Sequence, residues 1–295
     1  MTASVGISKF VLTRYPPVLS SVYVLAFGLG GIGLFAALAG ERIHASAIPM
    51  VVIVAVTLFA DLLVIRIVDD IRDSEYDRIA NPQRPVASGT VAHRALSTLC
   101  AVCVTVIVVA NLTFPSGLTI IVVQLLYTGV LTALGQRHPA IRGDNLVLNL
   151  LVGLPVQLLL YVYLLAAFAH ITADAPTAVV GGLGILILTL CAGQVEFGKK
   201  LVRRPARGER TYVNLIGYPA TALLTIGTGP LAVALFAAAA PVSPLWKAVV
   251  ALPAIGVAGF GVTYLRHKGN RWPATVSVLG LLGTLVAFAV VGAVG

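Results

Sequence analysis

The sequence predicts an all-α membrane protein, a bundle of about nine transmembrane helices with its N-terminus in the cytoplasm. Hydrophobic residues make up 58% of the 295 residues and charged residues only 11%, whereas a soluble domain carries roughly 25% charged residues. The apolar residues also come in runs of about 20, the length that crosses a bilayer core about 30 Å thick. Finally, the Lys and Arg residues gather in alternate polar breaks between these runs.

The polar breaks divide the chain into nine apolar runs within a single domain, residues 1–295. Backbone groups in lipid must be hydrogen-bonded within the segment, so each run is expected to be a helix. Gly- and Ala-rich stretches such as "FGLGGIGLFAALAG" suit close packing between helices. We expect the spans at residues 18–40, 46–68, 93–112, 116–134, 145–168, 177–197, 213–238, 245–265 and 274–294.

The distribution of basic residues predicts the topology. Of the 20 Lys and Arg residues, only Arg42 and Lys247 fall on one side of the nine spans. By the positive-inside rule the other side, which includes the N-terminus, faces the cytoplasm. We therefore expect a multi-pass protein of the cell membrane. The net charge of +9 is then a property of its cytoplasmic face and does not indicate a nucleic-acid partner.

Four aspartates end the second apolar run within the motif loop at residues 69–89: Asp69, Asp70, Asp73 and Asp77. On one continuous helix they fall within about 100° of one another around the axis. Carboxylates gathered on one face repel each other unless a cation lies between them, and Mg²⁺ prefers oxygen ligands and shares its coordination sphere with phosphates. The alternative is a solvated helix end neutralised by Arg66, Arg72 and Arg78, which would scatter the acids around the helix.

A second polar segment, residues 194–212, follows the sixth run. Helical spacing predicts that Lys200 and Arg203 share a face with Glu196, beside Lys199. These cations also fit a simple cytoplasmic anchor, but an acid at the end of a membrane helix costs energy and suggests function. Both polar segments are expected on the same membrane face. A metal-chelated anion with an apolar remainder, such as a prenyl diphosphate, fits between them.

The stretch "DDIRDSEYDRIANPQRPVASG" resembles the first motif of the UbiA superfamily of intramembrane prenyltransferases, and the resemblance extends over nearly the whole chain. It implies that Asp70, Asp73 and Asp77 are Mg²⁺ ligands, while Asp69 stands where Asn is common. It also implies that Arg78 and Arg84 contact the diphosphate or support the motif.

The second motif departs from the family pattern of two aspartates. This chain has Glu196-Phe-Gly-Lys-Lys200, followed by Glu209-Arg-Thr-Tyr212. It is similar to a subgroup with a Glu-x-x-Arg-Lys motif. The resemblance then implies that Glu196 is the only carboxylate offered here to a second Mg²⁺, that Lys200 contacts the phosphate directly, and that Tyr212 belongs to the substrate site.

The resemblance implies Mg²⁺-dependent transfer of a prenyl group to a small, often aromatic acceptor through an allylic carbocation. Two Mg²⁺ ions would bridge the diphosphate, and the expected partners are a prenyl diphosphate, the acceptor and the lipid bilayer, with no nucleic acid. The expected catalytic residues are Asp70, Asp73, Asp77, Glu196 and Lys200, assisted by Lys199 and Arg203.

Polar residues inside the spans are candidates for the substrate pocket: Asp61, Gln124, Tyr127, Asn149, Gln157 and Tyr161. Hydrogen bonds between helices explain each of them equally well. Asp61 lies roughly 12 Å along the helix from Asp69, deep enough to orient an acceptor or to take a proton.

Two alternative functions remain open. A UbiA-type terpene cyclase would use the prenyl chain's own double bond as the nucleophile, and the unusual second motif is compatible with it. A transporter of anionic lipids or metabolites is a more remote alternative, because such proteins place polar groups at the membrane midplane and often contain internal repeats.

Overall fold

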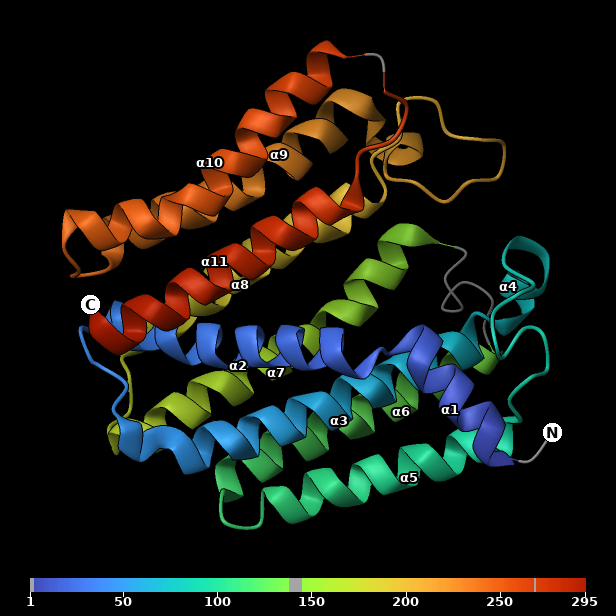
Figure 1. Cartoon of the computed structure of the whole chain (residues 1–295), viewed down its shortest axis with the longest axis horizontal. Coiled ribbons are helices and arrows are strands. Elements are labelled where there is room, and N and C mark those ends of the chain that lie inside the picture. The colour runs from blue at the N-terminus through green and yellow to red at the C-terminus, as the bar shows by residue number, and fades with distance from the viewer. Residues whose placement is uncertain (1–2, 138–144, 268) are drawn as a thin grey trace. The chain divides into compact units, whose positions relative to one another are not determined.

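The computed structural model describes residues 3–137, 145–267 and 269–295 (Figure 1). These residues are helical and contain no β-strand, apart from one isolated bridge between Val202 and Arg271. The helices are α1 (Ala3–Arg14), α2 (Pro17–Ala39), the short 3₁₀ helix η1 (Ala45–Ala47), α3 (Ile48–Arg72), α4 (Ser74–Ala80), α5 (His93–Ala110), α6 (Pro115–Arg137), α7 (Leu146–Thr172), α8 (Ala178–Lys199), α9 (Val213–Ala239), α10 (Pro244–Arg266) and α11 (Ala274–Val294).

Nine of the described helices are long and apolar enough to cross a membrane, as the sequence predicts. They are α2, α3 (extended at its start by η1) and α5 to α11, whereas α1 and α4 are shorter and more polar. The predicted boundaries hold to within about four residues at each end. The longest extensions are those of α3, which continues past the predicted end at residue 68 to Arg72, and of α7, which continues past residue 168 to Thr172.

Proline and glycine set several helix boundaries. Pro17, Pro115 and Pro244 open their helices, where a missing N–H costs nothing and the fixed φ suits the first turn. Gly217 in α9 has φ of 81° and ψ of 164°, so α9 consists of two helical segments joined at a kink. Only glycine adopts such a conformation without strain.

The described chain divides into two compact units, each considered by itself. The first consists of residues 1–25 and 49–163. A buried hydrogen-bonded chain joins three of its helices, because the Tyr163 hydroxyl donates to the Asn111 side chain over 2.9 Å and the Asn111 amide donates to the Thr57 hydroxyl over 2.7 Å. Asn111 and Thr57 are fully buried, and such hydrogen bonds hold helices together inside lipid.

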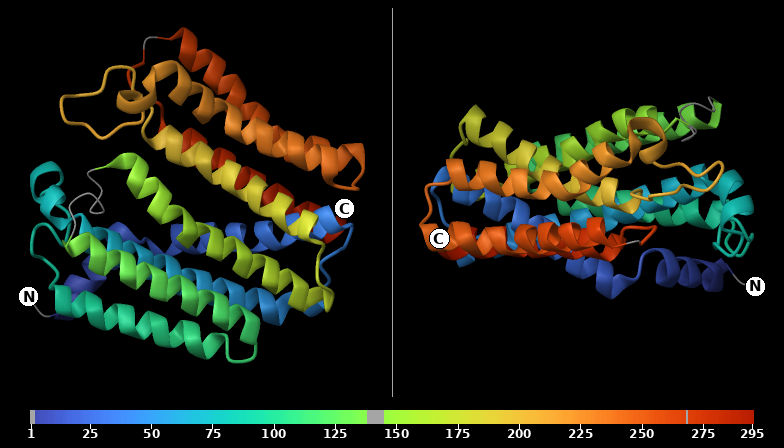
Figure 2. Two further views of the ribbon diagram at one scale, coloured as in Figure 1. Left: turned by 180° about the vertical axis from the view of Figure 1, so that it is seen from behind. Right: turned by 90° about the horizontal axis from the view of Figure 1, so that it is seen from above.

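The second unit consists of residues 26–48 and 164–295. Within it α8 packs against α9 and α11, and α10 packs against α9 and α11. The α8–α11 and α9–α10 neighbours lie side by side in Figure 1 and in both views of Figure 2. Glycines allow the closest approach, since a Cβ on Gly30 would lie 2.5 Å from the carbonyl oxygen of Leu285 in α11.

Candidate active site

The aspartate motif lies in the first unit, where α3 gives way to α4. Helix α3 ends at Arg72, Asp73 adopts φ of −87° and ψ of 3°, and α4 begins at Ser74. The prediction of one continuous helix through Asp77 is therefore wrong. Hydrogen bonds from the Asp73 amide to the Asp69 carbonyl and from the Asp77 amide to the Asp73 carbonyl nevertheless bridge the break, so the helical pattern of backbone hydrogen bonds continues across it.

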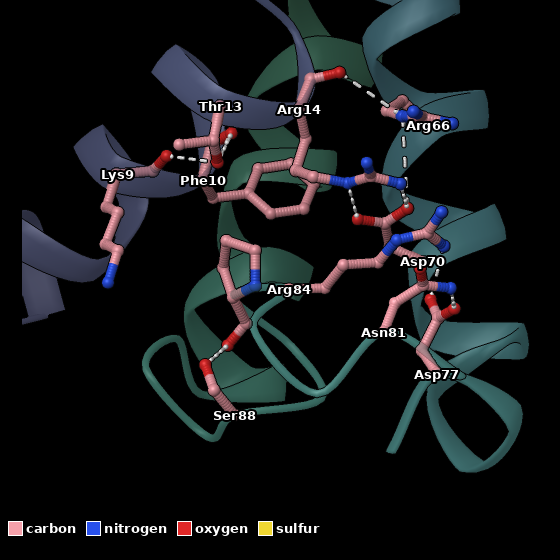
Figure 3. A network of polar contacts seen from close by, with 11 residues as sticks. Lys9, Phe10, Thr13, Arg14, Arg66, Asp70, Asp77, Asn81, Arg84 and Ser88 are labelled. Carbon is pink, nitrogen blue, oxygen red and sulfur yellow. Dashed lines mark hydrogen bonds and ion pairs between the residues drawn. The ribbon is translucent and has the colours of Figure 1, made fainter. Parts of the chain in front are cut away.

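Asp70 is buried in an ion pair with Arg14, the last residue of α1 (Figure 3). Arg14 donates from Nε to Oδ2 over 2.6 Å and from Nη2 to Oδ1 over 2.7 Å. The Asp70 side chain is 2% exposed. These hydrogen bonds raise the pKa of Arg14 above its ordinary value, and a paired guanidinium is what allows a carboxylate to remain charged when buried.

Asp77 is bound by the turn that follows it. Its Oδ2 accepts from Arg84 Nη1 over 2.6 Å and its Oδ1 accepts from Asn81 Nδ2 over 2.9 Å. The turn Asn81-Pro-Gln-Arg84-Pro thus folds back so that the Asn81 and Arg84 side chains meet the last aspartate of the motif (Figure 3). The aspartates and the turn that follows them in the sequence therefore also contact each other in the structure.

Asp69 and Asp73 are the more accessible carboxylates. Both pair with Arg72, at 3.0 Å and 3.3 Å respectively, and their side chains are 36% and 32% exposed. Arg78 lies on the exposed face of α4. The motif therefore combines two buried, fully hydrogen-bonded acids with two that solvent or a ligand can reach.

The donor chemistry of this motif fits a hard divalent cation, since carboxylate oxygens are the ligands that Mg²⁺ prefers. The arrangement is not that of a preassembled metal site. No group of three His, Cys, Asp or Glu residues in the described ranges is close enough to hold an ion, and guanidinium groups occupy Asp70 and Asp77. Asp70 and Asp77 could therefore bind Mg²⁺ only if the ion displaced the arginine side chains or bound beside them.

The second motif lies in the second unit, at the end of α8. Glu196 Oε1 accepts from Lys200 Nζ over 2.7 Å and from the Tyr212 hydroxyl over 3.0 Å. Lys200 also lies 5.1 Å from the centre of the Tyr212 ring. Burial and the neighbouring Glu196 charge raise the pKa of Tyr212, which keeps its hydroxyl protonated as a donor. Lys199 is exposed.

The predicted position of Arg203 on the face of Glu196 is wrong, because α8 ends at Lys199 and helical spacing no longer applies. Arg203 follows the bridge residue Val202. Its guanidinium lies 5.2 Å from the ring centres of both Tyr218 and Tyr264, and Nη2 donates to the Tyr264 and Leu265 carbonyls at the end of α10. Arg203 thus fastens the loop to α10.

The polar residues predicted for a substrate pocket mostly bond to protein groups within the first unit. The Tyr127 hydroxyl donates to the Val152 carbonyl, and Gln157 donates to the Tyr161 hydroxyl on the same helix. Asp61 is fully buried and lies 3.4 Å from Gln124 Nε2. Its Oδ1 has no hydrogen-bond partner among the described residues. The Tyr127 and Asp61–Gln124 contacts agree with the interhelical alternative. Gln124 Oε1, like Asp61 Oδ1, has no hydrogen-bond partner among the described residues.

Sequence reasoning missed Arg14 and assigned no contact to the Asn81 side chain. Arg14 lies 56 residues from Asp70, and no local spacing connects the two. One signal could have pointed to Arg14. It is one of few charged residues beside a membrane span, and a buried carboxylate requires a cation.

In the described part of the chain, fold and motif together define an all-α protein with nine membrane-length helices and an acidic cluster at the end of the second one. No protein-family model and no curated protein matches the chain. Among solved structures, the chain is similar to one of a digeranylgeranylglyceryl phosphate synthase in membranes, with 16% sequence identity, coverage of 97% of this chain and 98% of that chain, and a TM-score of 0.47. A likeness at this level carries no argument about the present chain.

Proposed function

We propose that the protein transfers a prenyl group from an isoprenyl diphosphate to a small, often aromatic acceptor within the membrane. The observation that carries this proposal is the cluster formed by the first motif. Buried Asp70 and Asp77 and accessible Asp69 and Asp73 gather at the end of a membrane helix, with Asn81 and Arg84 folded onto Asp77. A structural anchor needs no such concentration of acids in a chain with 11 Asp and Glu residues.

The acids are the residues that would hold Mg²⁺, with Asp73 as the accessible first ligand and Asp70 and Asp77 joining as their arginines shift. When bound, Mg²⁺ would offset the negative charge that develops on the leaving diphosphate. Arg84, once released from Asp77, is a cation within reach of the same group. An arginine matches phosphate geometry with two parallel hydrogen bonds.

The second motif supplies the remaining positive charge in this proposal. Four membrane-length helices, α5 to α8, lie between the end of α3 and the end of α8 among the described residues, so alternating crossings predict that both motifs face the same side of the membrane. Lys200 is 26% exposed and Lys199 is exposed, and both are candidates to bind the diphosphate. Glu196 and Tyr212 hold Lys200 in place. Glu196, with a side chain 34% exposed, is the candidate ligand for a second ion.

The test is product analysis of the purified protein in lipid nanodiscs with Mg²⁺ and geranyl, farnesyl or geranylgeranyl diphosphate, first without and then with a panel of aromatic acids. We expect a prenylated acceptor and release of diphosphate. Asp73→Asn should lower turnover at least about a hundredfold, which corresponds to about 3 kcal/mol of lost transition-state stabilisation. The matched control Asp174→Asn changes an exposed aspartate in the loop between α7 and α8 and should leave turnover unchanged.

Two outcomes would overturn the proposal. A cyclic hydrocarbon formed without acceptor, and lost in Asp73→Asn, would make the protein a terpene cyclase. Diphosphates of all three chain lengths that neither bind nor react would show that the aspartate cluster has another purpose.

A further inference from the structure

An apolar hollow of about 390 Å³ opens in the first unit between α2, α3 and α5. Its lining is hydrocarbon except for Ser21 and the Cys103 thiol, and it includes Phe59, Leu63 and Val106. Val102 and Val106 at its edge are 54% and 41% exposed. In a helix that crosses a bilayer such side chains face lipid, so the hollow opens toward the acyl chains and has the volume of a small ligand pocket.

The hollow lies about one helical turn from the Arg66 guanidinium on α3, on the side toward the membrane interior. Phe59, Leu63 and Arg66 are spaced four and three residues apart, so they share one face of the helix, and Arg66 stands about 4.5 Å further along the axis than Leu63. Tyr15 crosses from the α1–α2 junction to this face. Its ring packs edge-on against Phe59 at 5.1 Å and its hydroxyl donates to the Phe59 carbonyl over 2.9 Å.

Arg66 has unused hydrogen-bonding capacity. Its Nε donates to the Arg14 carbonyl over 3.2 Å and lies 3.9 Å from Asp70 Oδ1 (Figure 3). Asp70 already accepts both of the short bonds from Arg14, so two arginines surround a single carboxylate. Neither Nη of Arg66 bonds to any residue in the described ranges, and the side chain is 37% exposed. Arg66 thus offers two unbonded guanidinium nitrogens to a further anion at the membrane-surface end of the hollow.

We propose that the hollow binds one acyl chain of an anionic phospholipid whose phosphate is bound by Arg66. The charge complementarity selects an anionic headgroup, and the hydrocarbon lining selects the chain below it. The depth order also fits, because the phosphate of a phospholipid lies at the surface and its chains run inward. The site is separate from the proposed prenyl transfer, because neither the hollow nor the free Nη atoms of Arg66 are used there.

The experiment is native mass spectrometry of the intact protein released from nanodiscs that contain equal amounts of phosphatidylglycerol and phosphatidylcholine with identical acyl chains. We expect wild-type protein to retain phosphatidylglycerol about fivefold more than phosphatidylcholine, since one cation near the surface contributes about 1 kcal/mol. Arg66→Gln should abolish the preference and Arg66→Lys should largely restore it. The control Arg42→Gln, in the loop before η1, should leave it unchanged.

A second variant tests the hollow without touching the charge. Val106→Trp fills its lip from a position 41% exposed to lipid, so folding should tolerate it, and retention of phosphatidylglycerol should fall. Equal retention of both lipids by wild type, a preference that survives Arg66→Gln, or retention unaffected by Val106→Trp would each overturn the proposal. Displacement of the lipid by geranylgeranyl diphosphate would also overturn it. None of these readouts involves turnover, so their outcome does not test the proposed prenyl transfer.

Discussion

Arg14 and Asp70 form the most buried ion pair of the aspartate motif, with side chains 14% and 2% exposed. A buried carboxylate that loses its cation keeps the cost of desolvation without the compensating attraction. Arg72, by contrast, pairs with Asp69 where both side chains are accessible, at 24% and 36% exposure. Both arginines bind carboxylates of the same motif, one where the pair is buried and one where it is accessible. Comparing them therefore separates the effect of burial from that of charge.

We expect Arg14→Gln to lower the free energy of unfolding by about 3–5 kcal/mol and Arg72→Gln by less than about 1 kcal/mol. Thermal denaturation in detergent with a tryptophan or dye signal measures the difference. Added Mg²⁺ should recover part of the stability of Arg14→Gln, because binding to the vacated Asp70 favours the folded state. Equal losses in the two variants would show that the Arg14–Asp70 pair is not buried as described.

Arg203 offers a second test at the scale of one residue. Arg203→Lys keeps the charge, but an ammonium cannot stack between Tyr218 and Tyr264 while reaching two carbonyl groups. We expect a loss of about 1.5–3 kcal/mol of stability, the range for a hydrogen bond to a charged group, with unchanged diphosphate affinity. Arg204→Lys, at an exposed neighbour, is the control. If Arg203→Lys bound diphosphate more weakly but kept full stability, Arg203 would instead be a substrate-binding residue.

At the scale of helices, the second unit depends on glycine contacts between α2 and α11. A Cβ on Gly33 would collide with the Phe288 carbonyl oxygen, and a Cβ on Gly292 would collide with the Gly33 backbone. Backbone atoms of packed helices cannot move aside as flexible side chains do, so the helices must separate to admit a methyl group.

Gly33→Ala should therefore destabilise the protein by about 1–3 kcal/mol. Gly182→Ala on α8 should be neutral or stabilising, because nothing lies within 4 Å of the added Cβ and alanine is the better helix former. Parallel melting curves of the two variants provide the measurement. Similar destabilisation by both would mean that α2 and α11 do not approach as closely as described.

The membrane helices could be predicted from the sequence because hydropathy is a local property. The contacts between distant side chains could not, because they depend on tertiary packing. The spans from α2 to α11 were predicted to within a few residues because about 20 apolar residues in a row have no other stable state in lipid. Arg203 was misplaced because helical periodicity was carried past the end of α8 at Lys199. Arg14 was missed because tertiary packing alone brings it to Asp70.

At the scale of the whole molecule, the topology remains a prediction of the basic-residue distribution. In a variant whose three cysteines, Cys100, Cys103 and Cys191, are replaced by alanine, single cysteines at Ser88 and Asp174 lie in loops on opposite sides of the spans. A membrane-impermeant maleimide should label Asp174→Cys in intact cells and Ser88→Cys only after permeabilisation. Labelling in the reverse order would put the motif face outside the cell.

The attachment of α1 to the aspartate cluster has a consequence for dynamics. The carbonyl of Arg14 accepts from Arg66 and its guanidinium binds Asp70, so the last turn of α1 is ordered by the residues that a ligand would disturb. Any ion or substrate that draws Asp70 away from Arg14 should loosen that turn. Faster deuterium uptake by the amides of residues 11–15 then becomes a label-free indicator of site occupancy, located on a different helix from the aspartates themselves.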